Sequence, residues 1–240
     1  KVSELLDYKC SDKFGEYGYV LITDFLTPQQ HTELNQECQS LSQYAETLQA
    51  NQDNWIITEP GNPCKLDGAM AASSVFRELG NNPTLVSTAK QILQYERLDT
   101  YISKFFPMVP NKGFSVDWHQ DNHYIQAHPT QLISCDVFVN GADKDNGCIR
   151  IVPYSHFDGI RDHTNPSHNG VFRWIDVDDS NVIDIELDQP FAILFDVDLI
   201  HGCYTNTSDR YRYSIAWEYI NSGYKPKTHN GHRSQDRLPV

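Results

Sequence analysis

The order of two sequence patterns along the chain, one typical of helices and one typical of strands, constrains its fold more than any other feature. The first hundred residues contain two segments with helix start signals, whereas residues 100–220 carry short runs rich in aromatic and β-branched residues. Such runs, separated by Gly, Pro, Asn and Asp, predict strands. Helices followed by a series of strands favour an α+β chain, in which the helices cover one face of a β core.

The strand-rich part predicts a β structure of two layers or a closed roll. We expect strands at Thr100–Phe106, Gln131–Val139, Cys148–Pro153, Val182–Leu187, Ala192–Asp196 and Tyr211–Ile220. Asp145-Asn146-Gly147 gives the clearest signal for a hairpin turn between them. Many short strands with few helices between them are typical of a jelly roll. The predicted fold class is therefore mainly β (α+β): a double-stranded β-helix (jelly roll, cupin-like) braced by N-terminal helices.

The N-terminal part opens with a strand and a capped helix. The run Tyr19–Phe25 predicts the strand, and the helix is expected from Pro28 to about Leu48. Thr27 can accept the N-cap hydrogen bond, and Pro28 suits the first helical position. Gln30 completes the spacing of a capping box. Because its apolar content is low, we expect this helix on the outside of a larger structure.

A second helix is expected at Pro83–Leu93. The intervening segment Asn51–Ser74 is predicted to be a loop, because Pro60-Gly61-Asn62-Pro63 strongly breaks regular structure. This segment, Gly159–Asp184 and the polar tail after Asn221 are long and polar. Such segments either cover the entrance of a binding site or form ordinary surface loops.

The length of the chain fits one domain. We expect a single unit over residues 1–240, with a β core at about 100–220 and a polar C-terminal segment at 221–240. The six cysteines are scattered and form no C-x-x-C pair, which favours free thiols and a cytoplasmic location. A targeting segment removed from before Lys1 stays an alternative.

Charge and hydropathy limit the partners. The formal net charge of −13 at pH 7 opposes binding to nucleic acid, which requires a basic face. The sequence contains no run of about 18 apolar residues, and we therefore expect no membrane span. A small anionic ligand stays compatible with this charge, because one local arginine can outweigh a distant field. No pattern indicates the oligomeric state.

The most informative short segment is DWHQDNH at residues 117–123. On a strand, residues two apart point to the same face, so that His119 and Asp121 can reach one ion. His201 is the best third ligand, because it follows an apolar strand and Gly202 allows a close backbone approach. Two histidines and one carboxylate that leave one side of the ion open form the facial triad of non-haem iron(II) oxygenases.

Other histidines are weaker candidates. His123 could join His119 in an H-x-x-x-H zinc site if the segment were helical, but Asn122 and the aromatic flank argue against a helix. A hydrolytic zinc site at the three residues of the triad stays an alternative. We expect surface or core positions for His31, His163, His168, His229 and His232.

An arginine eleven residues after His201 indicates how a second ligand could be held. Arg212 and Ser214 lie two apart on a predicted strand and therefore share a face. A guanidinium group matches a carboxylate, and a Ser hydroxyl can add a further hydrogen bond. This pair would hold one end of a dicarboxylate whose other end chelates the metal. The alternative is that Arg212 is a surface charge on its strand.

Three motifs, taken in order, resemble the phytanoyl-CoA dioxygenase family. They are WHQDNHY at 118–124, DNGCIRIVPYSH at 145–156 and HGCYTNTSDRYRYS at 201–214. The opening GYVLITDFLTPQQ, from Gly18, is also similar to that family, so that the resemblance extends from about Gly18 to Ile220. Each motif alone is unspecific, but their joint occurrence in this order is specific.

The resemblance implies a double-stranded β-helix that uses Fe(II) as its cofactor and 2-oxoglutarate and O2 as cosubstrates. By matching position, the catalytic iron ligands are His119, Asp121 and His201. Arg212 then binds the distal carboxylate of 2-oxoglutarate, with Ser214 as its helper. Halogenating relatives carry Gly or Ala at the position of Asp121, so that halogenation is not expected.

Some residues near the motifs match the family and others depart from it. Asn206 and Ser208 match its spacing after the distal His and are expected to shape a turn. Tyr154 stands where the family often has Gly, and Cys203 where it often has Ser. Val137 stands where we expect the Trp of the family. These departures leave the metal ligands intact but prevent a transfer of the acyl-CoA substrate.

The implied function is an Fe(II)/2-oxoglutarate-dependent dioxygenase that oxidises an unactivated C–H bond of a small-molecule substrate and releases succinate and CO2. Hydroxylation, desaturation and oxidative cyclisation all stay open. So do two other classes: a non-catalytic β-roll binding module, and a cupin-type metalloenzyme that does not use 2-oxoglutarate. The candidates for binding a substrate carboxylate are Lys65, Arg77, Lys104, Arg161 and Arg173.

Overall fold

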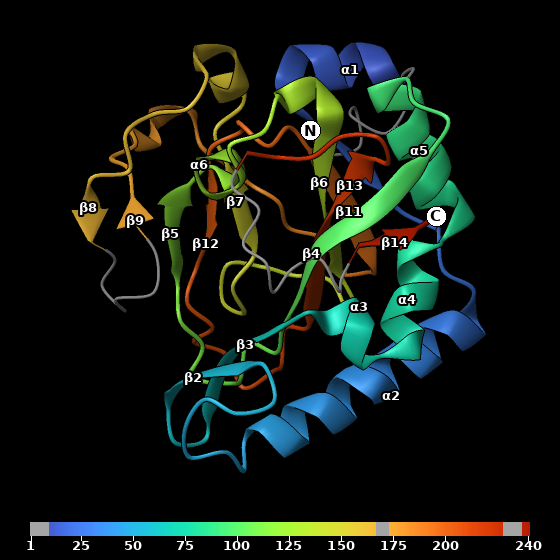
Figure 1. Cartoon of the computed structure of the whole chain (residues 1–240). Coiled ribbons are helices and arrows are strands. Elements are labelled where there is room, and N and C mark those ends of the chain that lie inside the picture. Colours follow the sequence, from blue (N-terminus) through green and yellow to red (C-terminus); the bar gives the residue numbers. More distant parts are fainter. Residues whose placement is uncertain (1–9, 167–172, 228–236) are drawn as a thin grey trace.

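Two antiparallel sheets form the core of the computed structural model, which describes residues 10–166, 173–227 and 237–240 (Figure 1). The large sheet has the spatial order β1 (Tyr19–Ile22), β11 (Phe191–Phe195), β6 (Leu132–Phe138), β13 (Ser214–Asn221), β4 (Leu98–Phe106), β3 (Asn62–Asp67) and β2 (Trp55–Glu59), with β14 (Leu238–Pro239) paired to β4. The small sheet has the order β10 (Ile183–Asp184), β7 (Ile149–Ile151), β12 (His201–Cys203) and β5 (Val116–His119). A separate ribbon pairs β8 (Asn165–Pro166) with β9 (Arg173–Trp174).

Helices cover the face of the large sheet that points away from the small sheet (Figure 1). They are α1 (Cys10–Tyr17), α2 (Pro28–Ala45), α3 (Ala69–Ala72), α4 (Ser74–Gly80) and α5 (Pro83–Leu93), while α6 (Asp121–Ile125) follows β5; short 3-10 turns lie at Pro129–Gln131, Ser155–Asp158 and Asp179–Asn181. Leu34 of α2, Phe76 of α4 and Leu85 of α5 are buried in one cluster with Cys135 and Val137 of β6.

The alternation of side chains along β6 explains why polar groups lie between the two sheets. Cys135 and Val137 point outward into the helices, where their burial stabilises the fold. Ser134, Asp136 and Phe138 therefore point inward, and Asp136 and Phe138 line a cavity between the sheets. The large sheet thus has one apolar face for the core and one mixed face for a binding site.

The predicted fold class is confirmed, and so are the predicted helices. The helix expected from Pro28 ends at Ala45, and the second helix has the predicted bounds Pro83–Leu93. The capping box is present: Thr27 Oγ1 accepts a 3.2 Å hydrogen bond from the Gln30 amide, and Gln30 Oε1 accepts one of 2.9 Å from the Thr27 amide. Each of the six strands predicted after residue 100 overlaps an observed strand, although β7 and β10 are shorter than predicted.

The prediction of a loop at Asn51–Ser74 is wrong. β2 and β3 form an antiparallel pair in this segment, and α3 follows them. Trp55 and Leu66 face each other across the pair and are both buried. The Pro60-Gly61 breaker makes the tight turn inside this hairpin, where Gly61 has a φ of +74°. A strong turn signal therefore marked a connection between strands and not the absence of strands.

The predicted hairpin at Asp145-Asn146-Gly147 is also wrong. A turn does form there, since the carbonyl of Asp143 accepts hydrogen bonds from the amides of Gly147 and Cys148. However, the strands on its two sides, β6 and β7, belong to different sheets. The turn carries the chain from the large sheet to the small one, which is the type of connection that a roll of two facing sheets requires.

Candidate metal centre and its pocket

Neighbouring strands of the small sheet bring two histidines together. β5 ends at His119, β12 begins at His201, and these two residues are direct partners in the antiparallel pair. Nδ1 of His119 lies 2.9 Å from the carbonyl oxygen of Asp117, and Nδ1 of His201 lies 3.0 Å from that of Leu199. Because each Nδ1–H donates to a carbonyl, both rings present Nε2 as the metal-binding atom.

Asp121 reaches the same point from a helix, and its predicted position on a strand is wrong. β5 ends at His119, Gln120 is extended, and Asp121 is the first residue of α6. Oδ1 of Asp121 lies 3.6 Å from Nε2 of His119 and 3.8 Å from Nε2 of His201. The three ligand atoms lie within 4.8 Å of one another, so that one ion can bind all three.

The charges of the three residues suit a divalent metal. Burial alone would raise the pKa of the Asp121 carboxyl, but attraction to the imidazoles of His201 and His119 outweighs burial and holds this pKa below its usual range. Burial, followed by the proximity of His119, lowers the pKa of His201 to about 4. An ionised carboxylate and a neutral imidazole are the forms that bind a metal ion.

Arg212 and Ser214 lie on the inner face of the large sheet. Arg212 precedes β13, and its Nη1 donates a 2.5 Å hydrogen bond to Oγ of Ser214. The guanidinium lies 5.1 Å from the centroid of the Phe138 ring, and only 3% of the residue is exposed. The alternative that Arg212 is a surface charge is thus wrong, and its role as an anchor stays a prediction.

The buried guanidinium has unused binding capacity. Its Nε has no hydrogen-bond partner among the described residues, and no ion pair of the described residues involves Arg212. A buried charge without a partner is costly, and a carboxylate is the group that a guanidinium binds best. The residues present therefore fit the terminal carboxylate of 2-oxoglutarate.

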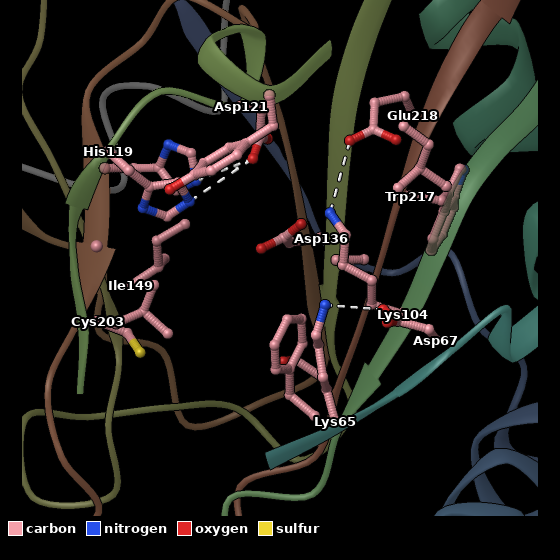
Figure 2. A pocket seen from close by; sticks show the side chains of 18 of the residues that line it. Lys65, Asp67, Lys104, His119, Asp121, Asp136, Ile149, Cys203, Trp217 and Glu218 are labelled. Carbon is pink, nitrogen blue, oxygen red and sulfur yellow. Dashed lines mark hydrogen bonds and ion pairs between the residues drawn. The ribbon is translucent and has the colours of Figure 1, made fainter. Parts of the chain in front are cut away.

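A cavity of about 300 Å³ joins the three candidate metal ligands to Arg212. Figure 2 shows Asp136 in its centre, between the His119 side and two lysines. Sequence reasoning missed several of its charged residues, namely Asp67, Asp136 and Glu218. The available signal was a charged residue at an alternate position of an otherwise apolar strand, as in Gln131–Val139.

Two of the five predicted substrate anchors line this cavity. They are Lys65 and Lys104. Arg77 instead donates to main-chain carbonyls, and Arg161 pairs with an exposed aspartate. The side chain of Arg173 lies outside the described residues.

The remaining histidines have structural positions where they are described. The expectation that the segment around His123 is not helical is wrong, because His123 lies in α6. Its ring stacks on that of His163 with centroids 3.9 Å apart, and Nε2 of His163 accepts a hydrogen bond from the Gln120 amide. His31 lies 2.9 Å from the carbonyl of Val139. Three of the predicted histidines lie outside the described residues: His168, His229 and His232.

The residues that depart from the family pattern have different surroundings. Val137 is buried in the core behind β6, whereas Cys203 lines the cavity. Tyr154 has a φ of +67°, a backbone conformation that Gly adopts without strain. Asn206 shapes its turn as predicted, since its Nδ2 donates to the carbonyls of Met108 and Arg210.

The predicted entrance segments also differ from one another. Asn51–Ser74 lines the cavity through β2 and β3, with Ile56, Lys65 and Asp67. Parts of the other two segments, 167–172 and 228–236, lie outside the described residues. The last residues, Leu238–Pro239, pair with β4.

Two expectations about the whole chain are tested by the described residues. The five cysteines with described side chains are all free, as predicted: Cys38, Cys64, Cys135, Cys148 and Cys203. Within the described ranges, none of the helices has the length and apolar character needed to cross a membrane.

Comparisons with known proteins identify the family of this chain. The family model described as phytanoyl-CoA dioxygenase (PhyH) matches residues 14–214. Phytanoyl-CoA dioxygenase 1 from Oryza sativa subsp. japonica is 24% identical over 149 residues, which are 57% of this chain and 50% of the relative. The chain thus spans about half the length of that curated relative.

Solved structures share the fold. The non-haem monooxygenase ThoJ matches with a TM-score of 0.74 and 19% identity, over 92% of this chain and 80% of ThoJ. EctD from S. alaskensis, determined with 2-oxoglutarate and 5-hydroxyectoine, matches with a TM-score of 0.73 and 18% identity, over 90% of this chain and 77% of EctD.

Proposed function

Because the chain belongs to the phytanoyl-CoA dioxygenase family, we propose that it is a 2-oxoglutarate-dependent non-haem iron oxygenase. His119, Asp121 and His201 hold Fe(II) on one side and leave the other side open. Arg212 and Ser214 bind the distal carboxylate of 2-oxoglutarate. Residues 1–240 act as one oxygenase domain, which is supported by a cavity lined by strands from β2 to β13.

The chemistry that the bound metal and cosubstrate supply is the activation of O2, coupled to conversion of 2-oxoglutarate into succinate and CO2. The protein positions the reactants and excludes water. Oδ2 of Asp121 accepts a hydrogen bond from Ser134, which fixes the carboxylate for metal binding. The carbonyls beside the two Nδ1 atoms fix the imidazole rings in the same way.

The reaction that we propose is the oxidation of an unactivated C–H bond in a small molecule, by hydroxylation, desaturation or ring closure. Asp121 supports this choice over halogenation, because its carboxylate lies at the shared point of the two Nε2 atoms. The cavity of about 300 Å³ lies at the lower end of the range for ligand pockets, and the cosubstrate occupies part of it. A small substrate is therefore favoured.

The observation that carries this proposal is the unpartnered Nε of Arg212 in the cavity that contains the three metal-binding residues. A structural zinc site would need no such group. The same observation distinguishes the proposal from a cupin-type metalloenzyme without 2-oxoglutarate, and from a binding module that has lost its chemistry.

The test compares two arginines that lie two residues apart. Anaerobic Fe(II) and 2-oxoglutarate should give the wild-type protein a visible charge-transfer band. Replacement of the buried Arg212 (Arg212→Met) should raise the concentration of 2-oxoglutarate that half-saturates this band by about tenfold or more. Arg210 pairs with Asp143 on the surface, so that Arg210→Met should leave the band unchanged. A wild-type protein without the band, or an unaltered Arg212→Met, would contradict the proposal.

A further inference from the structure

The cavity extends beyond the metal centre along the inner face of the large sheet, as far as β3 and β2 (Figure 2). This part contains two ion pairs. Nζ of Lys65 lies 2.8 Å from Oδ1 of Asp67, and Nζ of Lys104 lies 3.8 Å from Oε1 of Glu218. Neither the metal ligands nor Arg212 need these four charges. Because burying charges is costly, their presence on a cavity wall indicates a ligand that uses charge.

One row of residues across the large sheet places opposite charges side by side. Asp136 of β6 pairs in register with Ala216 of β13, which pairs with Lys104 of β4. All three line the cavity. Neighbouring strands lie about 4.8 Å apart, so that the Cα atoms of Asp136 and Lys104 lie about 10 Å apart. The small side chain of Ala216 leaves the space between them open.

Asp136 also lies on the path of the cosubstrate. Two residues before Ala216 on β13, Ser214 pairs with Phe138 and contacts Arg212. Two residues after Ala216, Glu218 pairs with Ser134, which contacts Asp121. Asp136 therefore lies between these two levels. A dicarboxylate that spans from Arg212 to the metal must therefore pass Asp136.

Among the described residues, no hydrogen bond or ion pair involves the side chain of Asp136. Burial, followed by the charge of Asp121, raises the pKa of its carboxyl to about 7, although Lys104, Arg212 and His119 oppose this shift. A bound dianion would add further repulsion. A positively charged group on the substrate would remove that repulsion.

We propose that the substrate is a small zwitterion, whose basic nitrogen binds Asp136 and whose carboxylate binds Lys104. This inference rests on the proposed function and names the substrate class of the same site. A substrate with only a carboxylate would leave Asp136 facing a second anion. A substrate with only an amine would leave the Lys104–Glu218 pair unused. A molecule with both charges satisfies both sides of the row.

The test measures ligand binding to the anaerobic protein loaded with Fe(II) and 2-oxoglutarate. The probes are the protein amino acids and other small amino acids, each with its N-acetyl and carboxamide derivative. Calorimetry should identify a zwitterion that binds and whose two derivatives bind about tenfold or more weakly. Succinate release in air should then increase with that zwitterion alone.

Variants locate the two charges. Asp136→Asn should weaken binding of the zwitterion about tenfold or more. It should weaken binding of the N-acetyl derivative only slightly, because that derivative has already lost the same contact. Lys104→Met should likewise weaken binding of the zwitterion but weaken binding of the carboxamide derivative only slightly. Lys112 is exposed, so that Lys112→Met serves as the matched control and should bind like wild type.

The outcomes separate this inference from the proposed function. The charge-transfer band shows for every variant that the metal and 2-oxoglutarate still bind; its absence in the wild type would contradict the proposed function itself. Three results overturn the inference when the band is present: no zwitterion of the set binds, a derivative binds as tightly as its zwitterion, or either Asp136→Asn or Lys104→Met leaves the affinity for the zwitterion unchanged.

Discussion

Ser134 lies on β6 and donates a 2.6 Å hydrogen bond to Oδ2 of Asp121, while Oδ1 of that carboxylate faces both histidines. Oδ2 is thereby fixed by the hydrogen bond, and Oδ1 is left to bind a metal. Oγ of Ser214 instead accepts a hydrogen bond, from Nη1 of Arg212. Two serines on the inner face of the large sheet thus position the two charged groups on which the proposed reaction depends.

We expect these two serines to affect different ligands. Ser134→Ala should weaken Fe(II) or Co(II) binding about 10- to 100-fold, because the supporting hydrogen bond to a ligand is lost. Ser214→Ala should weaken 2-oxoglutarate binding and leave metal affinity unchanged. Metal titration and titration of the charge-transfer band measure the two effects. Equal loss of metal affinity in both variants would show that neither serine has a specific role.

The turn between β11 and β12 directs His201 into the cavity. Asp196 begins this turn, and its Oδ1 accepts a 2.8 Å hydrogen bond from the Asp198 amide. Burial raises the pKa of Asp196 to about 6, although this hydrogen bond opposes the shift. The folded chain therefore favours the protonated carboxyl, and ionisation of Asp196 destabilises the fold as the pH rises.

The sign of this effect gives a prediction. The folded pKa of about 6 lies above the ordinary value of 3.8, so that stability is lost between about pH 4 and pH 6 and stays reduced above that range. Asp196→Asn keeps the hydrogen bond without the charge. It should raise the free energy of unfolding at pH 7.5 by up to about 3 kcal/mol and leave it nearly unchanged at pH 4. Urea unfolding at both pH values measures this, and an equal gain at both would contradict it.

At the scale of elements, helices were easier to predict than the connections between strands. Thr27, Pro28 and Gln30 specify a helix start through contacts within one turn, which a sequence displays directly. The segment Asn51–Ser74 was misread because its breaker also serves as a hairpin turn. The hairpin signal at residues 145–147 was misread because the pairing partner of a strand depends on residues far away in the chain.

At the scale of the whole molecule, the close pairing of β5 with β12 joins residues 82 positions apart into one candidate metal centre. Gly202 permits this approach. A Cβ atom added there would lie 2.7 Å from the carbonyl oxygen of Val116 on β5, which is backbone and cannot swing aside. The two strands would have to separate, and the two histidines would move with them.

Gly202→Ala should therefore affect the metal centre more than the fold. We expect metal affinity to fall about tenfold or more, because displacement of a ligand by a fraction of an ångström already spoils the site geometry. Gly15 has no atom within 4 Å of an added Cβ, so that Gly15→Ala is the matched control and should bind metal normally. Metal titration with parallel thermal unfolding distinguishes the two effects. Unchanged metal affinity in Gly202→Ala would be evidence against this role of the strand approach.

The sequence alone determined the caps of the helices and the β character after residue 100, and it supplied the candidate metal ligands and the arginine proposed to bind a dicarboxylate. These features depend on short spacings and on chemical types, which a linear chain displays. Only the tertiary structure decided that Asp121 belongs to a helix, and that Asp136 and Lys104 share one row of the sheet with Ala216 between them. Strand register and the facing of two sheets arise from packing between distant segments, and no local pattern encodes them.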